Sequence, residues 1–301
     1  MIRAWLVVVI VGVAGLPAHG EEFRILAWNV ESNRPNARAV TDAAVIAAQL
    51  TALMKDPATT AQIVALSEVE PRNAVAYQRA IAAGLGTEVD FVTSASGGYQ
   101  DADSLLLVVD RKRFAIEEAT EVHRYAGLAA NFVVTTEDSP EHGTVRARSP
   151  LLVQLRDRAD EGTFRLFVTH LARGEADLRT DQARVLRRWA QDHPEEPIIA
   201  AGDFNFDYDF RTARGNEAYD AMTEGDAWQW LKPDPLVDSN WTDDRNQPGR
   251  DLYPDSILDF VFVANRARQW RGESDVVVRP GDFPDDDRTS DHRPIIATFR
   301  P

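Results

Sequence analysis

Several apolar stretches of the chain run into side chains that carry oxygen or nitrogen. In AAGDFNFDY (200–208), small apolar residues give way to Asp203 and Asn205, two positions apart. Residues two apart on a strand project from the same face of a sheet, so we expect both side chains at one end of a buried strand. Gly, Asp and Asn are also common in turns, so this stretch alone does not separate a turn from part of an active site.

Polar groups stand at comparable places elsewhere in the chain. The motifs AWNVES, ALSEVE, FVTHL and TSDHRP place six of them at the ends of apolar stretches: Asn29, Glu31, Glu68, His170, Asp291 and His292. Any one of these alone is best explained as a solvated side chain. Asp259 is different because it lies between Leu258 and Phe260, where burial is expected. A buried carboxylate needs a partner, and a protonated histidine is a natural one.

Together these side chains make a coherent chemical set. Asn29, Glu68 and Asp291 offer only hard oxygen ligands, which favour Mg²⁺, Mn²⁺ or Ca²⁺ over zinc. Mg²⁺ commonly keeps coordination positions open for water and phosphate. His170 and His292, with a further Asp, would complete an acid–base set. Such a site suits in-line attack of water on phosphorus.

The elements that must position these groups follow from the apolar patterns. We expect helices over 41–56, 73–85 and 174–193, and strands over 23–30, 61–70, 89–93, 104–110, 114–119, 151–157, 164–170, 197–205, 257–264, 275–278 and 294–300. This order is neither a uniform βαβ repeat nor an all-β pattern. It favours an α/β (α+β) fold, a four-layer sandwich of two mixed sheets packed face to face with helices on the outer sides. Residues 206–256 are rich in Asp, Asn, Pro, Gly and Trp and are expected to be loop-rich and close to the site.

Length and composition fit one folded domain. The chain has 301 residues, of which 44% are hydrophobic and 27% charged, and it contains no Cys. Disulfides, thiolate chemistry and Cys-bound metal are therefore excluded. The formal net charge of −15 argues against non-specific binding of nucleic acid, which depends on Lys and Arg. No Lys/Arg stripe that could track a nucleic-acid backbone is evident, and we expect a monomer.

The first twenty residues have the pattern of a secretory signal peptide. Arg3 precedes an apolar run from Ala4 to Leu16, and small residues follow up to Gly20. The run is too short to span a bilayer comfortably. We therefore expect export to the periplasm or the extracellular space, with a single mature domain over 21–301 and no stable membrane anchor after cleavage. Loss of one Arg and no acid changes the net charge to −16.

In their order along the chain, WNVES, LSEVE, THL, GDFN, ILDFVF and SDHRP resemble the motifs of the endonuclease/exonuclease/phosphatase superfamily. That superfamily includes pancreatic-type deoxyribonucleases, abasic-site endonucleases, bacterial sphingomyelinases and inositol polyphosphate phosphatases. The resemblance extends from about Phe23 to Phe299, which is nearly the whole mature chain.

The resemblance implies metal binding, Mg²⁺ foremost with Mn²⁺ or Ca²⁺ as alternatives, and it implies a role for each motif residue. Glu68 is the central ligand with Asn29 beside it, Asp291 lies near the metal, and Glu31 is a further acid in some relatives. Asp203 orients or deprotonates the attacking water, and Asn205 holds Asp203 and touches the phosphate. His292 would contact a phosphoryl oxygen while Asp259 keeps it cationic, and His170 is the second phosphate-binding or acid histidine.

Two further assignments follow from the same resemblance. An acid before the strand 104–110 pairs with the first histidine in many relatives, and Asp103 fits that place, with Asp101 as the alternative. Arg148 in RARSPLL fits the position of an arginine that contacts phosphate, although an ordinary arginine at the start of a strand would look the same.

Three functions remain open at this point. The first is an exported nuclease or nucleotide phosphodiesterase. The second is a phosphoesterase acting on a small molecule or lipid headgroup, in which Trp228, Trp230 and Trp241 could form an apolar wall, although ordinary packing of that segment is the simpler expectation. The third is a non-catalytic binding module, against which the intact motif positions argue. A phosphate ester is the expected partner in the first two cases.

Overall fold

The structure is a computed structural model that describes residues 20–30, 41–95, 104–130, 133–134, 145–146, 148–240, 256–283, 285–286 and 288–301. Residues 1–19 of the expected signal peptide, together with Glu31, Asp101, Asp103 and Trp241, lie outside the described residues. Within the described ranges, no helix combines the length and the apolar character needed to cross a bilayer.

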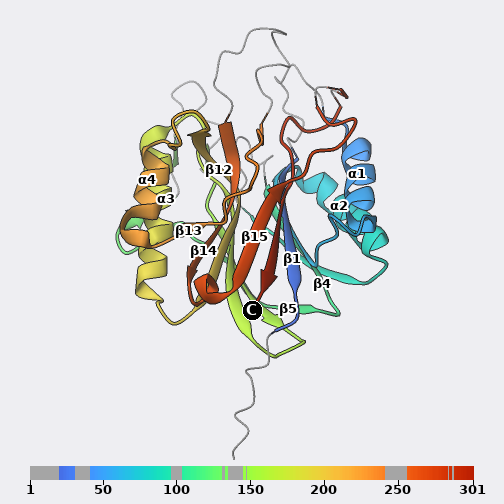
Figure 1. Cartoon of the computed structure of the whole chain (residues 1–301), viewed down its shortest axis with the longest axis horizontal. Helices are drawn as coiled ribbons and strands as arrows, with labels where there is room; N and C mark the ends of the chain where they lie inside the picture. Colours follow the sequence, from blue (N-terminus) through green and yellow to red (C-terminus); the bar gives the residue numbers. More distant parts are fainter. Residues whose placement is uncertain are drawn as a thin grey trace, which may run out of the picture.

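Two six-stranded sheets form the centre of the molecule (Figure 1). The first has the strand order β15 (Arg271–Val276), β16 (Ile295–Arg300), β1 (Phe23–Asn29), β2 (Ile63–Val69), β4 (Ser104–Asp110), β3 (Val89–Thr93). The second has the order β13 (Gln229–Trp230), β14 (Ser256–Asn265), β12 (Pro197–Asp209), β11 (Thr163–His170), β10 (Leu151–Asp157), β5 (Phe114–Glu121). In each sheet one adjacent pair is parallel, β1 with β2 and β11 with β12, and the other pairs are antiparallel.

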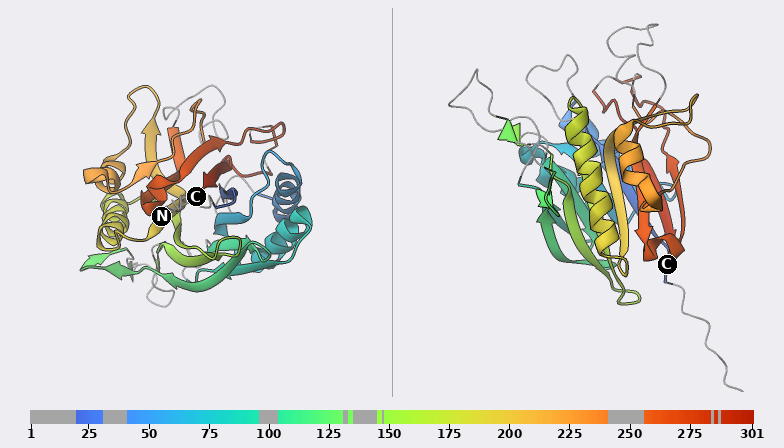
Figure 2. Two further views of the ribbon diagram at one scale, coloured as in Figure 1. Left: turned by 60° about the horizontal axis from the view of Figure 1, so that its bottom comes forward. Right: turned by 90° about the vertical axis from the view of Figure 1, so that its left-hand side faces the viewer.

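Helices cover the outer face of each sheet, as Figure 2 shows from two further directions. On one side lie α1 (Ala43–Lys55) and α2 (Ala74–Leu85), and on the other α3 (Ala176–Asp192) and α4 (Glu217–Thr223). Short 3-10 turns span Pro71–Asn73, Glu224–Asp226 and Arg266–Gln269, and two small ribbons pair β6 (Arg124–Tyr125) with β7 (Leu128–Ala129) and β8 (Val133–Val134) with β9 (Val145–Arg146). The four-layer sandwich expected from the sequence is confirmed.

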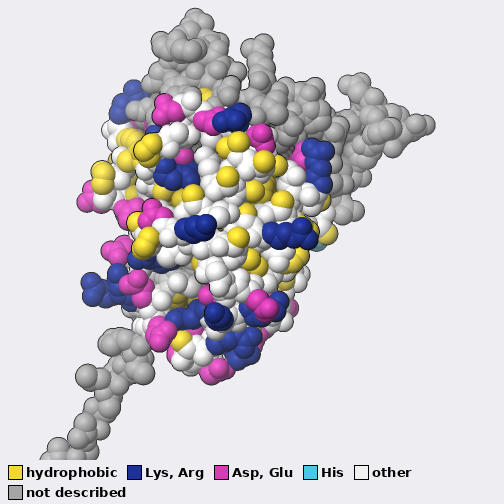
Figure 3. Space-filling model, turned by 90° about the vertical axis from the view of Figure 1, so that its right-hand side faces the viewer, with side chains coloured by type: hydrophobic (Ala, Val, Ile, Leu, Met, Phe, Trp, Pro, Cys, Tyr) yellow, Lys and Arg dark blue, Asp and Glu magenta, His cyan; other side chains and the backbone are white. Residues whose placement is uncertain are grey.

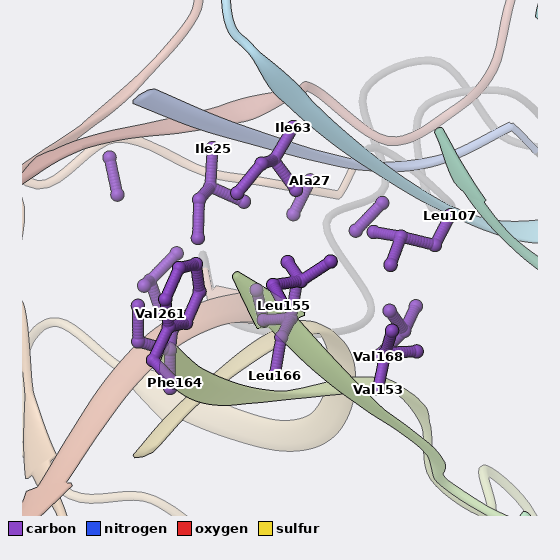
Figure 4. Packing of buried hydrophobic residues seen from close by; sticks show 14 of the residues in the cluster. Ile25, Ala27, Ile63, Leu107, Val153, Leu155, Phe164, Leu166, Val168 and Val261 are labelled. Atoms are coloured by element: carbon purple, nitrogen blue, oxygen red, sulfur yellow. The ribbon is translucent and has the colours of Figure 1, made fainter. Parts of the chain in front are cut away.

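The core between the sheets is built by alternate residues of the central strands (Figure 4). Ile25 and Ala27 of β1 face inward toward residues such as Leu166 of β11, whereas Leu26 and Trp28 pack on the other face, in the cluster beneath α1 and α2. Since both faces of these strands are covered, their sequences are almost continuously apolar rather than alternating. This explains why the positions of these strands could be predicted from the sequence, whereas the residues that face the space between the sheets could not.

Some expected boundaries differ from the structure. The strand expected over 197–205 continues to Asp209, and β15 covers 271–276 instead of 275–278. The segment expected to be loop-rich contains the end of β12, α4 and β13. Trp228 is only 2% exposed and packs in the cluster beneath α3 and α4, so its contribution is to the core rather than to an exposed apolar wall.

The surface over α1 and α2 carries Lys and Arg side chains scattered among apolar and acidic ones (Figure 3). On this face they do not gather into a stripe along which a nucleic-acid backbone could run. Many arginines of the described residues are instead paired with acids, such as Arg111 with Glu88 and Asp90.

Candidate active site

The candidate site is the polar end of the core between the two sheets. On β12, Ile199 and Ala201 belong to this core, and Asp203 is the next residue on the same face. On three other strands, the inward-facing row of apolar residues also ends in a polar residue. These residues are Asn29 on β1, His170 on β11 and Asp259 on β14. All of these side chains are buried. The inward direction of each group therefore follows from the register that buries the hydrophobic residues below it.

Strand pairing brings three of these residues into one row. Asp203 pairs with His170 on the parallel neighbour β11 and with Asp259 on the antiparallel neighbour β14. From the opposite sheet, Asn29 Nδ2 donates to Asp203 Oδ2 at 3.0 Å. Asp203 thus takes part in a polar contact between the two sheets.

Gly202, directly before Asp203, is required by the spacing of β11 and β12. It has φ 136°, and an added Cβ would lie 2.3 Å from the carbonyl oxygen of Thr169. Glycine adopts such backbone angles without steric cost. The glycine of the GDFN motif therefore allows the two strands to approach where Asp203 and His170 project into the site.

Asp203 carries an unusual carboxyl group. Its Oδ2 lies 3.4 Å from His170 Nε2 and 4.0 Å from His292 Nε2, while its Oδ1 accepts the main-chain N–H of Asn205 at 2.9 Å. Burial and the nearby charge of Asp259 raise the pKa of Asp203 to about 6, although His292, Asn29 and Arg148 act to lower it. This carboxyl group can exchange a proton near neutral pH.

His292 is fixed from three directions. Its Nδ1 lies 2.8 Å from Asp259 Oδ2, its main-chain N–H donates to Ser290 Oγ at 3.0 Å, and its carbonyl oxygen accepts the indole N–H of Trp28 at 2.9 Å. Burial alone would lower the pKa of His292, but the charge and hydrogen bond of Asp259, with the charges of Asp203 and Asp291, raise it well above 6.5. His292 is therefore cationic at neutral pH, with Nε2 directed toward the other site residues.

Glu68 lies at the other side of the site, in a distortion of β2. It has φ 55°, and the pairing of β2 with β4 shifts register between Leu66 and Val69. Such bulges re-aim side chains and occur often beside active sites. Glu68 Oε1 accepts from Asn29 Nδ2 at 3.2 Å and lies 3.4 Å from His170 Nε2.

Arg148 links the two groups on this side. One guanidinium nitrogen, Nη1, contacts His170 Nε2, and the other, Nη2, lies 3.9 Å from Glu68 Oε1. Arg148 is the group from which a phosphoryl oxygen could receive charge-assisted hydrogen bonds.

The charges of the site fit a divalent cation. Among the described residues of the site, four buried carboxylates (Glu68, Asp203, Asp259 and Asp291) lie together with two cations, Arg148 and His292, so acidic groups outnumber these cations. Ligand atoms of Asp203, Asp259 and His292 lie within 4.8 Å of one another, but a metal between the last two would break their 2.8 Å hydrogen bond. The oxygen donors Asn29, Glu68 and Asp291 are the better set for a hard cation such as Mg²⁺.

Asn205 contacts Asp203 through its main chain. It was expected to hold Asp203 and to touch the phosphate. It is the main-chain N–H of Asn205 that holds Asp203, whereas Nδ2 donates to the carbonyl oxygen of Leu171 at 2.9 Å. Glu31 and Asp103 lie outside the described residues.

Three supporting residues were missed from the sequence. The hydroxyl group of Ser290 links Asn29 and His292. It donates to the carbonyl oxygen of Asn29 at 2.6 Å and accepts from the main-chain N–H of His292. Gln182 on α3 is fully buried, accepts from the N–H of Ala172 and donates to the carbonyl oxygen of Arg148. Asn216 contacts the segment after Asp203. Ser290 could have been suspected from its place in SDHRP, but the two amides stand in contexts where polar residues are usually solvated.

The chain belongs to the endonuclease/exonuclease/phosphatase family, whose model matches residues 26–292. The family comprises phosphoester hydrolases, and the fold is theirs. No curated protein sequence matches the chain significantly.

Solved structures with the same fold include enzymes with different substrates. A family member from Bacteroides thetaiotaomicron has 16% identity and a TM-score of 0.65, covering 93% of this chain and 98% of its own. A mannosyl-6-phosphatase from Bacteroides thetaiotaomicron VPI-5482 has 16% identity and a TM-score of 0.62, with coverages of 91% and 98%. TDP2 from D. rerio, complexed with a single-strand DNA product, has 18% identity and a TM-score of 0.62, with coverages of 92% and 98%. At these identities the similarity concerns the fold.

Proposed function

We propose that the protein is an exported, metal-dependent phosphoesterase that hydrolyses P–O bonds by in-line attack of water, and that its substrates are phosphodiesters. The observation that carries the proposal is the environment of Asp203. Its buried carboxyl group has a pKa of about 6 and lies within 4.0 Å of both histidines of the site. Such a group can accept a proton from water, and both imidazoles lie on its side of the site.

Each side chain then has a defined task. Asp203 orients the attacking water and takes its proton, while cationic His292 donates to a phosphoryl oxygen as negative charge develops there. Asp259 keeps His292 charged, and Arg148 with His170 binds a second phosphoryl oxygen. Asn29, Glu68 and Asp291 would hold a Mg²⁺ ion, which supplies Lewis-acid stabilisation of the charged phosphoryl group.

The preference for a diester rests on the pair of histidines. The two imidazoles beside Asp203 provide two groups that can face the non-bridging phosphoryl oxygens, and the single negative charge of a diester can be compensated by such a pair. The formal net charge of −15 makes long duplexes poor ligands, because non-specific binding of their phosphates depends on Lys and Arg. Short, single-stranded or nucleotide-sized substrates fit better.

The second candidate is a phosphatase or phosphodiesterase for a small molecule or a lipid headgroup. The acidic composition favours it, since one phosphate group can be satisfied by Arg148, His170 and His292 without further basic residues. The mannosyl-6-phosphatase shows that the same fold occurs in a sugar-phosphate enzyme.

The test is hydrolysis by residues 21–301 in Mg²⁺ and then in EDTA. The substrates are plasmid DNA, single-stranded RNA, bis-p-nitrophenyl phosphate, p-nitrophenyl phosphate and sphingomyelin. We expect EDTA-sensitive cleavage of the diesters and none by an Asp203→Asn variant. Cleavage of p-nitrophenyl phosphate alone would overturn the diester assignment in favour of a phosphatase, and full activity of the Asp203→Asn variant would overturn the site assignment.

Export has its own test. Residues 1–20, fused to a reporter that is active only outside the cytoplasm, should yield reporter activity, and the full chain should be shortened by about twenty residues in the exported fraction. A variant with Asp in place of Val8 and Val9 serves as the control, because charges in the apolar run should block export. An unshortened chain that stays in the cytoplasm would contradict the proposal.

A further inference from the structure

The segment that follows Asp203 leaves the sheet in an unusual way. β12 pairs with β14 through Asp203 opposite Asp259, and pairing resumes with Tyr208 opposite Ile257. Residues 204–207 therefore stand against one residue of β14. An excess of residues on one strand interrupts the hydrogen-bond ladder and bends the strand. We call residues 204–207 the bulge.

The bulge has two alternating sets of side chains. Phe204 and Phe206 are fully buried in the core beneath α3 and α4. Asn205 and Asp207 have positive φ angles of 53° and 46°, the left-handed conformation that Asn and Asp tolerate better than most residues. It is in this conformation that the N–H of Asn205 meets Asp203 Oδ1. The position of the Asp203 carboxyl group therefore depends on a backbone shape that the β-sheet does not itself maintain.

Asn216 supplies hydrogen bonds in the region where the β14 ladder is interrupted. Its Nδ2 donates to the carbonyl oxygen of Asn205 at 2.8 Å and to Asp207 Oδ2 at 3.2 Å, and its main-chain N–H donates to the carbonyl oxygen of Phe206 at 2.8 Å. The residue before Asn216 is Gly215, which lies close to Tyr219 of α4. A Cβ at position 215 would lie 2.4 Å from Cβ of Tyr219, so a residue without a side chain is needed there.

The same side chain caps a helix. Oδ1 of Asn216 accepts from the main-chain N–H groups of Ala218 and Tyr219 at 3.2 and 3.3 Å, at the start of α4. The oxygen and the nitrogen of one side-chain amide thus have different roles. The oxygen accepts hydrogen bonds from the first turn of α4, as N-cap residues do, and the nitrogen donates hydrogen bonds to the bulge.

We propose that Asn216 is a positioning residue for Asp203: it clamps the bulge in the shape that directs the Asn205 N–H at the Asp203 carboxylate. This inference rests on the proposed function only for the consequence in catalysis. The clamp should affect the chemical step rather than substrate binding, because Asp203 acts on the water and not on the bound phosphate.

The two tasks of the amide can be separated by substitution. Asn216→Ser retains a capping oxygen and removes the donor to Asn205. Asn216→Asp also retains the cap but places a carboxylate against the Asn205 carbonyl oxygen and Asp207. Asp42→Ala is the matched control, because Asp42 caps α1 by accepting from the N–H of Ala44 and has no part in the bulge.

We expect kcat to fall about tenfold in Asn216→Ser and further in Asn216→Asp, with KM changed less than twofold. Asp42→Ala should lower the thermal midpoint at least as much while leaving kcat unchanged. Unchanged kcat in Asn216→Ser would overturn the catalytic consequence of the clamp, as would a loss of kcat in Asp42→Ala equal to that in Asn216→Ser. If Asn216→Asp does not fold, Asn216→Ser decides.

A second measurement is independent of activity. Hydrogen exchange of the Asn205 amide should be at least tenfold faster in Asn216→Ser than in the unmodified protein and unchanged in Asp42→Ala. Faster exchange with unchanged kcat would retain the clamp and overturn its catalytic consequence. Equal exchange in all three proteins would overturn the clamp. Wild-type turnover by Asp203→Asn, assayed in parallel, would instead show that the proposed function is at fault.

Discussion

The imidazole of His292 and the carboxylate of Asp259 form a buried pair, with Nδ1 of the histidine 2.8 Å from Oδ2 of the acid. They approach from different sheets: Asp259 lies on β14, whereas His292 lies just before β16. The pair leaves Nε2 of His292 on the side of Asp203 and Asp291. A histidine held in this way can remain a cation in an environment that would otherwise favour its neutral form.

Replacing Asp259 with Asn should therefore change the pH dependence as well as the rate. Loss of the carboxylate charge lowers the pKa of His292, so that the imidazole becomes neutral at a lower pH. We expect kcat to fall about 100-fold at pH 8, with the alkaline limb of the kcat/KM profile moved to lower pH. Asp275→Asn, the same change at an exposed position on β15, is the control. An unchanged alkaline limb would show that His292 does not need its charge.

Asp203→Asn should abolish turnover and stabilise the metal-free protein at neutral pH. The pKa of Asp203 in the fold is about 6, above the ordinary value of 3.8, so the folded state favours the protonated form. Ionisation therefore costs folding free energy as pH rises through this window, and the cost is complete above pH 6. A variant that cannot ionise avoids it. We expect a thermal midpoint several degrees higher in EDTA at pH 8.

The difference in thermal midpoint between Asp203→Asn and the unmodified protein should vanish or change sign below the ordinary pKa of 3.8. There the Asp203 carboxyl group is protonated in both the folded and the unfolded chain. In the unmodified enzyme, kcat/KM should fall as pH decreases through about 6, because the protonated group cannot accept a proton from water. Calorimetry of both proteins in EDTA, from below pH 3.8 to pH 8, checks the predicted difference in thermal midpoint. A variant less stable than the unmodified protein at pH 8 would contradict it.

Glu68→Gln should weaken metal binding. A ligand that binds only the folded state stabilises it by about 2.7 kcal/mol at 100 times its Kd. We expect Mg²⁺ to raise the thermal midpoint of the unmodified protein and to do so much less in Glu68→Gln. Glu70→Gln is a matched control on the same strand end, since Glu70 is held by Arg72. Equal Mg²⁺ responses in all three proteins would exclude Glu68 as a ligand.

Gln182→Leu should disturb the side of the site that binds phosphate. This buried amide joins the carbonyl oxygen of Arg148 at 2.9 Å to the N–H of Ala172 at 2.9 Å, two residues after His170. Without it we expect KM to rise about tenfold, and the effect to disappear in an Arg148→Ala background. Asn265→Leu is the control, because Asn265 also donates to two carbonyl oxygens, those of Ala190 and His193, but at the far end of α3. Equal changes in KM would contradict a specific role.

Much of the fold could be predicted because the central strands of the sandwich are apolar and bounded by polar residues, whereas the largely polar β15 was placed wrongly. The same property made Asp259 informative, as an acid within an apolar run has few explanations other than a buried pair. Its observed partner, His292, was also the expected one.

The details that could not be predicted depend on register and on contacts between distant segments. β12 continues beyond Asn205 because the bulge absorbs residues 204–207 and pairing resumes at Tyr208. Neither Gln182 nor Asn216 stands in a distinctive pattern, since a helical glutamine and an asparagine before a helix are ordinary residues. Their importance comes from which carbonyl oxygens the fold brings to them.

The pairing of β1 with both β2 and β16 has a consequence for synthesis of the protein. The second neighbour of β1 comes from a distant part of the chain, and the indole of Trp28 meets the carbonyl oxygen of His292, 264 positions later. A nascent chain that has not yet reached His292 can form neither this contact nor the pair between His292 and Asp259. Hydrolytic capacity should thus be acquired only after residue 292 has been synthesised, which would spare the cell from a partly made but active phosphoesterase.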